Sequence, residues 1–314
     1  MNRRCPVIRM SSRLQVTVRI HGGLGNQLFM YAFARRLSID NGADLVLDTT
    51  SGFLRDPFHR QCMLGHFHVA GGTASRRESY MDTAGVVRRA IDRQLNHWLP
   101  LQQRWYLRER SWQFDPSHAG LRIRRSVYVE GYWQSAEYLC PIADVLREDL
   151  AFAWQPGDDV RRLAESLEHT DSVCVHVRRY LSPASVAPSA ARELPTEYYD
   201  RAIDAIRRNY PSANFHVFTD QPRCAVVDHL ATKGCRRVAA PDGPDRDIAD
   251  FWLMTRCRHF VVGNSTYSWW AAWLGHEARK VVIAPARDDR IMNIMMTTPA
   301  SWTRISPREA NEAC

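Results

Sequence analysis

The chain has 314 residues, of which 45% are hydrophobic, so it can bury a sizeable core as two domains of ordinary size or one large one. Its formal net charge of +8 suits an anionic partner: a nucleic acid, an anionic membrane surface or a phosphorylated substrate. No apolar run approaches the ~20 residues that span a bilayer, and the basic residues are dispersed rather than gathered in a tract, which argues against an integral membrane protein or a basic nucleic-acid-binding tail.

The cysteines and histidines indicate neither a disulfide framework nor a metal site. The eight cysteines include no C-x-x-C pair, so we expect reduced thiols in a reducing compartment. His66 and His68 flank Phe67, but no third ligand stands near them. The first thirteen residues are basic and lack the apolar region of a secretory signal, so we expect a loose tail.

The first predicted unit is a strand, a glycine-rich turn and a helix. Residues 14–20 (LQVTVRI) alternate as a strand does, residues 21–27 (HGGLGNQ) form the turn, and helical spacing follows until Asn41-Gly42. Gly23 and Gly25 would let backbone N–H groups approach a ligand at the helix N-terminus. A G-x-G-x-x-G or P-loop pattern is absent, so a tight turn without a ligand stays open. Residues 44–48 give a second strand and hence a parallel βαβ start.

The rest of the first half is less regular. Residues 49–72 are loop-like, and residues 76–101 form an arginine-bearing helical stretch without a readable role. Residues 127–132 predict a strand, and residues 134–150 an amphipathic helix capped by Ser135. The pattern breaks at residues 155–158, so we predict two α/β domains, residues 14–154 and 155–314.

The second half centres on SVCVHVRR, residues 172–179. Its β-branched run predicts a buried strand that ends in Arg178 and Arg179. Ligands of open α/β sheets lie beyond the carboxyl ends of the strands, and a guanidinium binds phosphate oxygens in bidentate fashion. The pair therefore suggests a phosphorylated ligand, although a solvated strand end is the plainer alternative.

Further strand ends carry polar groups. A helix that we expect Thr196 to cap precedes a strand over residues 214–219, which ends in Asp220. A helix over residues 247–256 and a strand over residues 259–262 follow. The turn after that strand carries Asn264, Ser265, Thr266 and Ser268, and hydroxyls and amides at such a junction can bind an anion. A helix is predicted from residue 269, with its tryptophans in the core.

The order of these motifs resembles the bacterial α-1,2-fucosyltransferase family. The similar stretches are GGLGNQLFMYAFARRL, GYWQSAEYL, HVRR, HVFTD and DFWLMTRCRHFVVGNSTYSWWAAWL, and the resemblance covers residues 16–283. That family is similar in turn to protein O-fucosyltransferases and the core α-1,6-fucosyltransferase. The resemblance implies a GT-B-like fold, in which two Rossmann-type α/β domains face a central cleft. It implies inverting transfer from GDP-β-L-fucose, with no cofactor and no essential metal.

The resemblance also implies roles for particular residues. Arg178 and Arg179 would hold the β-phosphate and stabilise departing GDP. His176 and Asp250 would face the guanine, and Asn26 would approach the fucose from the first domain. The expected donor-binding set is completed by groups at the turns and strand ends: Gly23, Gly25, Asp220, Asn264, Ser265, Thr266 and Ser268.

The expected chemistry passes through an oxocarbenium-like transition state. Glu193 and His21 are the candidates for a general base, which would contribute about 10²- to 10⁴-fold. A mechanism without a base competes with both. The family normally continues the arginine pair with Gly-Asp-Tyr, whereas Tyr180 follows Arg179 directly here, and loss of a supporting acid can weaken a site.

The sequence therefore predicts a cytoplasmic enzyme that transfers L-fucose to a terminal galactose of a cell-envelope oligosaccharide, with peripheral contact at the inner membrane. No nucleic-acid partner is expected. One alternative is a weakened or inactive homologue that binds nucleic acid or an anionic membrane through its basic charge. Another is a transferase with a different GDP-sugar or linkage.

Overall fold

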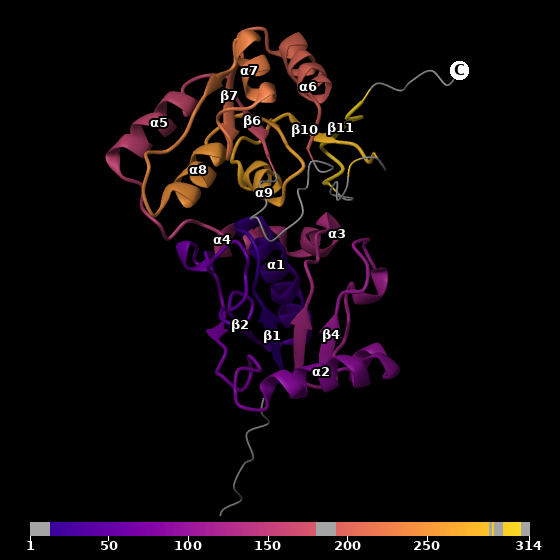
Figure 1. Cartoon of the computed structure of the whole chain (residues 1–314). Helices are drawn as coiled ribbons and strands as arrows, with labels where there is room; N and C mark the ends of the chain where they lie inside the picture. Colours follow the sequence, from indigo (N-terminus) through magenta and orange to yellow (C-terminus); the bar gives the residue numbers. More distant parts are fainter. Residues whose placement is uncertain (1–12, 180–192, 289–290, 292–297, 309–314) are drawn as a thin grey trace, which may run out of the picture.

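Two parallel sheets, one above the other in Figure 1, organise the chain. The computed structural model describes residues 13–179, 193–288, 291 and 298–308. The first sheet has the order β3-β2-β1-β5-β4, with bounds β1 Gln15–Arg19, β2 Asp44–Asp48, β3 Gly72–Thr73, β4 Tyr106–Arg108 and β5 Val127–Glu130. The second has the order β11-β10-β9-β6-β7-β8, with bounds β6 Ser172–Val177, β7 Asn214–Thr219, β8 Arg236–Arg237, β9 His259–Val261, β10 Val282–Pro285 and β11 Thr303–Ile305.

Helices connect the strands and cover both sheets. The α-helices are α1 Leu24–Asn41, α2 Gly85–Leu95, α3 Ala136–Leu139, α4 Ala143–Asp149, α5 Asp158–Glu168, α6 Thr196–Asn209, α7 Ala225–Thr232, α8 Arg246–Thr255 and α9 Thr266–Leu274. Short 3₁₀ turns lie at Leu64–His66, Asn96–Trp98, Leu101–Gln103, Pro116–His118 and Cys140–Ile142. Helices on the faces of parallel sheets are typical of doubly wound α/β folds.

The central strand of each sheet is buried, as its sequence predicts. Val16 and Val18 of β1 are fully buried between β2 and β5. Every residue of β6 is buried between β7 and β9. A strand covered on both faces must be apolar almost throughout, which explains the valine-rich run before Arg178.

One hydrophobic core spans the two halves, and a second, smaller one lies between α6 and the strands β6 and β7. The ring of Phe29 on α1 lies 4.7 Å from Trp269 and 5.0 Å from Trp270 on α9. At Gly25, an added Cβ would lie 2.3 Å from the backbone carbon of Thr266. Glycine is therefore required there because two helix N-termini touch, whereas the sequence suggested an approach to a ligand.

Several boundaries differ from the predicted ones for local reasons. The helix expected over residues 134–150 is broken into α3, a 3₁₀ turn and α4, because Pro141 lies in its middle. The prediction that Thr196 caps α6 was wrong, since Thr196 is already helical and Pro195 precedes it. Ser265 caps α9, so that helix begins at residue 266 rather than 269. The sheets draw their strands from residues 15–130 and 172–305, and the exact domain boundary near residue 154 stays a prediction.

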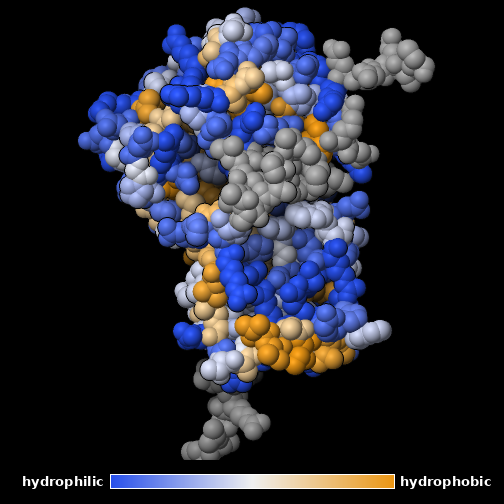
Figure 2. Space-filling model, viewed as in Figure 1, coloured by the Kyte–Doolittle hydropathy of each residue, from blue (hydrophilic) through white to orange (hydrophobic). Residues whose placement is uncertain are grey.

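Most of the visible surface is hydrophilic, but an apolar patch covers the lower end of the molecule, over α2 (Figure 2). None of the helices in the described residues combines the length and apolar character needed to cross a membrane.

Candidate active site

The strand order of the second sheet marks a ligand site. From β6 the chain proceeds outward to β7 and β8, and then returns to the other side of β6 for β9, β10 and β11. Ligands of open α/β sheets bind where the strand order reverses, outside the carboxyl ends of the strands. Here that point lies between the ends of β6 and β9, where Arg178 and the turn from Gly263 begin.

The two arginines after β6 are held by acids. The Arg178 guanidinium lies 2.8 Å from a carboxylate oxygen of Asp220, at the end of β7. The other oxygen of that carboxylate accepts the backbone N–H of Arg179 at 3.0 Å. The Arg179 guanidinium lies 2.9 Å from Glu193. Arg178 is 38% exposed, so a ligand can reach its fixed charge.

His176 lies directly beneath these charges. It is 4% exposed, and burial, followed by the nearby Arg178 charge, lowers its pKa to about 3. Its Nδ1 has no hydrogen-bond partner among the described residues. Gly263 packs against it, because a Cβ there would lie 3.1 Å from Nδ1 and 2.6 Å from the His176 carbonyl oxygen. A neutral imidazole is therefore fixed at the switch point.

The N-terminus of α9 faces the first half of the chain. Ser265 caps this helix by accepting the Tyr267 N–H at 3.3 Å, and the Ser268 hydroxyl donates to the Ser265 carbonyl at 3.2 Å. The Thr266 hydroxyl donates to Asn26 Oδ1 at 2.9 Å, and Gln134 Nε2 donates to the same oxygen at 2.9 Å. The Asn26 oxygen is thus committed to joining the halves, so any contact with a sugar would come from its amide nitrogen.

Asp250 lies on α8 beside the same sheet. It accepts the Ala240 N–H at 2.6 Å and lies 3.7 Å from Arg246. Burial raises the pKa of its carboxyl. A half-buried acid of this kind can pair with N–H donors such as those on one edge of guanine.

The first sheet reverses its strand order between β1 and β5, which marks a second candidate ligand position. His21 follows β1, and its ring meets Tyr132, which follows β5, edge-on at 4.8 Å. Burial, followed by the Arg19 charge, lowers the pKa of His21 to about 4. Trp112 stacks on Tyr132 at 5.2 Å and is 52% exposed. We call His21, Tyr132 and Trp112 the aromatic wall.

Glu109 fixes the turn that carries the wall. Its carboxylate accepts the N–H groups of Tyr132 at 2.6 Å and Trp133 at 3.0 Å. The turn needs this support because Trp133 adopts a φ of +55°, which a non-glycine residue rarely does. Gly131, at φ +157°, is glycine for a steric reason, since a Cβ there would lie 2.4 Å from Glu109.

Arg60 is a basic residue beside the glycine-rich turn, and no sequence pattern singled it out. Its guanidinium packs over Phe58 at 4.1 Å and lies beside Gly22. Burial lowers its pKa, and the charge of Arg178 contributes to that shift. Arg60 also lies 3.7 Å from Asp56, so its charge is partly balanced within the first half. A single basic residue in an irregular loop carries no pattern from which this could be inferred.

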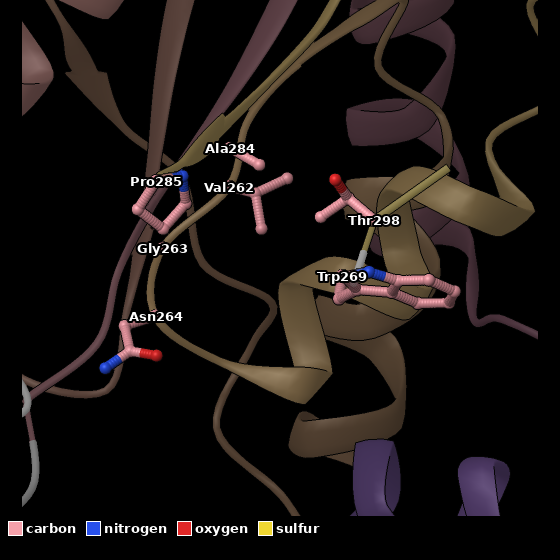
Figure 3. A pocket seen from close by; sticks show the side chains of 7 residues that line it. All are labelled: Val262, Gly263, Asn264, Trp269, Ala284, Pro285 and Thr298. Carbon is pink, nitrogen blue, oxygen red and sulfur yellow. The ribbon is translucent and has the colours of Figure 1, made fainter. Parts of the chain in front are cut away.

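A small cavity lies beside the second sheet, at the ends of β9 and β10. Figure 3 shows the Trp269 indole and Thr298 on one side of it and Val262, Ala284 and Pro285 on the other. It offers about 10 Å³, the room of roughly one water molecule. It is too small for a nucleotide, so the open ends of β6, β7 and β9 are the better candidate.

The structure brings most of the sequence-predicted site residues together. Arg178, Arg179, Asp220 and Glu193 form one ion-pair cluster. His176 packs on Gly263, where the turn carrying Asn264 and Ser265 begins. Gly23 precedes α1 and Gly25 lies in its first turn, against Thr266 of α9. Tyr132, Trp112 and Arg60 were missed, although Tyr132 lies within the GYWQSAEYL stretch. The position at which Gly-Asp is missing lies outside the described residues.

Two facing Rossmann-type domains with charged strand ends define a GT-B-like glycosyltransferase. The chain belongs to glycosyl transferase family 11, whose family model matches residues 88–305. It is 26% identical to the alpha-1,2-colitosyltransferase of Escherichia coli, over 92% of this chain and 98% of that protein. It is also 26% identical to the O-antigen biosynthesis glycosyltransferase WbnK of Escherichia coli, over 91% of this chain and 99% of that protein. Among solved structures, an Arabidopsis thaliana FUT1 variant in complex with GDP shares the fold, with a TM-score of 0.51, 13% identity, and 91% of this chain and 72% of that chain covered.

Proposed function

We propose that the protein is a galactoside α-1,2-fucosyltransferase that transfers L-fucose from GDP-β-L-fucose to a terminal galactose with inversion. The observation that carries this proposal is the position of Arg178. It is a reachable guanidinium, oriented by Asp220, at the switch point of one sheet, and its charge influences the pKa of Arg60 in the other half. A diphosphate bound there would lie between the two strand-end sites.

The donor-side chemistry follows from the charges. As the bond between fucose C1 and the β-phosphate oxygen breaks, negative charge grows on that oxygen and positive charge on the sugar ring. Arg178 and Arg179 would stabilise the departing GDP, because fixed charges cost no reorganisation during the reaction. His176 and Asp250 would face the guanine. Ser265, Thr266 and Ser268, with Asn264, would lie along the pyrophosphate. No metal or cofactor is part of this proposal.

The absence of the usual Gly-Asp after Arg179 favours the alternative of a weakened homologue. Against it, Asp220 and Glu193 already hold both arginines. An acid that orients the pair is therefore present, although it comes from elsewhere in the chain. This supports an active enzyme over a protein that binds nucleic acid or membrane by charge alone.

The acceptor hydroxyl must lose its proton as the new C–O bond forms. Glu193 is paired with Arg179, which suits it to positioning more than to proton transfer. His21 is neutral at pH 7 and can accept a proton, but a pKa of about 4 makes it a weak base. We therefore keep both His21 and a mechanism without a protein base in the proposal.

The aromatic wall is the proposed acceptor surface. A galactose presents an apolar face of C–H groups, and a flat exposed ring such as Trp112 can cover it. Tyr132 and His21 continue the wall toward Gly22 and Arg60.

A second candidate is α-1,2-colitosyl transfer, because one of the two relatives carries that activity in its name. Colitose is L-fucose without its 3-hydroxyl. A site built to bind that hydroxyl can discriminate against the deoxy sugar by about 10⁴-fold, so only one of the two donors should be efficient.

The deciding experiment incubates the purified protein with GDP-fucose, GDP-colitose or GDP-mannose and a panel of galactose-terminated oligosaccharides. Product mass identifies the sugar, and glycosidase digestion or NMR identifies the linkage. We expect α-1,2-fucosylated galactosides. Efficient product from GDP-colitose alone would establish the second candidate, and no product with any donor would contradict both.

We place the reaction in the cytoplasm, with peripheral contact at the inner membrane, because nucleotide sugars are made in the cytosol and lipid-linked glycans are assembled at that membrane face.

A further inference from the structure

Helix α2 turns its apolar side toward solvent. Its exposed apolar residues recur at Val87, Ile91 and Leu95, which is one stripe at four-residue spacing. These side chains are 64%, 50% and 53% exposed, and Val86 and Trp98 extend the stripe at 79% and 81%. In a helix packed on a globular core the stripe would face inward. Figure 2 shows it as the apolar patch at the lower end.

The charged side of α2 faces the first sheet instead. Arg89 and Arg93 both reach Glu130 at the end of β5. Arg88 lies 3.0 Å from Asp82, and the Tyr80 hydroxyl donates to Asp92 at 2.7 Å. These ion pairs and this hydrogen bond fix the rotation of the helix, so the fold holds the apolar stripe outward.

The surroundings of the stripe are basic. Two pairs of exposed arginines, Arg76-Arg77 and Arg124-Arg125, lie in the segments before α2 and before β5. Arg77 and Ser126 line the same groove, so these two segments are neighbours beside the helix. Between residues 71 and 126 the chain carries eleven arginines against five acids, and the side chain of Asp115 is the half-exposed one among these acids: Glu78, Asp82, Asp92, Glu109 and Asp115. An apolar centre with a rim of positive charge is complementary to an anionic lipid surface.

A second copy of the chain is a poorer fit. A helix of 11 residues is about 16 Å long and about 10 Å wide, so its face offers roughly 160 Å². A stable protein interface takes about 800 Å² from each partner. A two-fold contact through α2 would also place the arginine rims against each other. A bilayer needs only shallow insertion of the stripe.

We propose that α2 is a membrane-docking helix. Val87, Ile91, Leu95 and Trp98 insert at the boundary of headgroups and acyl chains, and the flanking arginines bind anionic headgroups. This deepens the proposed peripheral membrane contact, and it needs neither donor nor acceptor to be correctly assigned.

The test is sedimentation of the full chain with vesicles, without any substrate. One vesicle type is phosphatidylcholine alone, and the other contains phosphatidylglycerol as well. We expect binding only to the anionic vesicles, weakened at high salt. Replacing Val87, Ile91 and Leu95 together by serine should lower the binding constant by at least about tenfold, since each buried apolar side chain contributes to insertion. Arg76→Ser with Arg77→Ser should lower it by roughly fivefold or more.

The controls match chemistry and exposure. Arg236→Ser with Arg237→Ser removes an exposed arginine pair from the other half and should leave binding unchanged. Trp112→Ala removes an exposed tryptophan that lies outside the stripe, and it should also leave vesicle binding unchanged. Circular dichroism is used to check that each variant folds. We expect folded variants, because the replaced α2 residues are exposed.

Three results would overturn the proposal: no binding of the wild type to anionic vesicles, equal binding by the α2 variant, or a wild-type dimer in ultracentrifugation that the α2 variant abolishes. The last result would make the stripe an interface between copies.

Discussion

The ion pair of Arg178 and Asp220 gives the proposed donor site its orientation. The acid also accepts the Arg179 N–H, so it fixes backbone and side chain together. We predict that Arg178→Ala weakens GDP binding by about 100-fold, because a charged hydrogen bond to phosphate contributes about 1.5–3 kcal/mol. Asp220→Asn should weaken GDP binding by about tenfold, since the arginine remains but loses the carboxylate that orients it. Isothermal calorimetry measures both.

The matched control for this pair is Arg208→Ala, which removes an exposed arginine from the end of α6. It should leave GDP affinity unchanged. If Arg178→Ala also bound GDP normally, the donor site would lie elsewhere.

Trp112 carries a separate prediction for the acceptor side. We expect Trp112→Ala to raise the KM for the galactoside by about tenfold, because an aromatic contact and its buried area are lost. Donor affinity should not change, and Trp112→Phe should recover most of the loss. Trp98→Ala is the control, since Trp98 is equally aromatic and 81% exposed but lies at the α2 end. Unchanged acceptor kinetics in Trp112→Ala would remove the aromatic wall from the site.

His176 predicts how stability depends on pH. Its pKa is lowered to about 3 in the folded chain, against about 6.5 when unfolded. Between these values the unfolded chain binds a proton that the folded chain does not, so the free energy of unfolding must fall as pH is lowered. The contribution of neutral His176 to the free energy of unfolding is fully present above pH 6.5. It should be smaller by about 3 kcal/mol at pH 4.5.

Urea unfolding of the wild type and of His176→Gln between pH 7 and pH 4.5 measures this contribution. The variant should lose less stability over that range, whereas His68→Gln, which replaces an exposed histidine, should follow the wild type. Parallel curves for wild type and His176→Gln would show that this imidazole does not titrate with folding.

At the scale of elements, the contact between α1 and α9 decides how the two halves meet. A Cβ at Gly25 would lie 2.5 Å from the Thr266 carbonyl oxygen and from the Tyr267 nitrogen, which are backbone atoms that cannot rotate away. We predict that Gly25→Ala destabilises the protein by about 1–3 kcal/mol and weakens GDP binding, because α9 carries the Ser265 turn. Chemical unfolding and calorimetry measure the two effects.

Gly23→Ala is the neighbouring control. A Cβ there meets nothing within 4 Å, and the residue already has a φ of −75°. Its stability should change by less than about 0.5 kcal/mol. Equal effects at both glycines would mean that the contact is not the constraint.

The elements that the sequence predicted well are those with a strong period. The largely apolar strands β1, β2, β6 and β7 fall at the predicted places, because a strand buried in a sheet must be mostly apolar. The strands β3 and β8 have two residues each, too few for any period. The helix α2 was predicted only as an arginine-bearing helical stretch. Its apolar side faces solvent because its arginines pair with Glu130, which is distant in the sequence.

The same reasoning separates the parts of the site. Polar groups after buried strands could be found from the chain alone, since parallel strands bring their carboxyl ends together. Arg60 and Trp112 lie in irregular loops, and only the fold brings them to the strand ends. The roles proposed for all these residues stay predictions until a ligand is bound.

At the scale of the whole molecule, the larger of the two hydrophobic cores is continuous between the two sheets. It runs from Val18 of β1 through Phe29 of α1 to Trp269 and Trp270 of α9. Halves that share a core cannot separate without exposing these rings to water. The position of the two strand-end sites relative to each other is therefore set by this packing.

This shared core predicts one cooperative unfolding transition, although two-domain proteins often show two. Near-ultraviolet circular dichroism, which reports the tryptophans, should coincide with far-ultraviolet circular dichroism on heating. GDP at 100 times its dissociation constant should stabilise the folded state by about 2.7 kcal/mol and raise the midpoint of that single transition by a few degrees. Two resolved transitions, with GDP shifting only one, would show that the donor half folds alone. The α1–α9 contact would then act as a hinge.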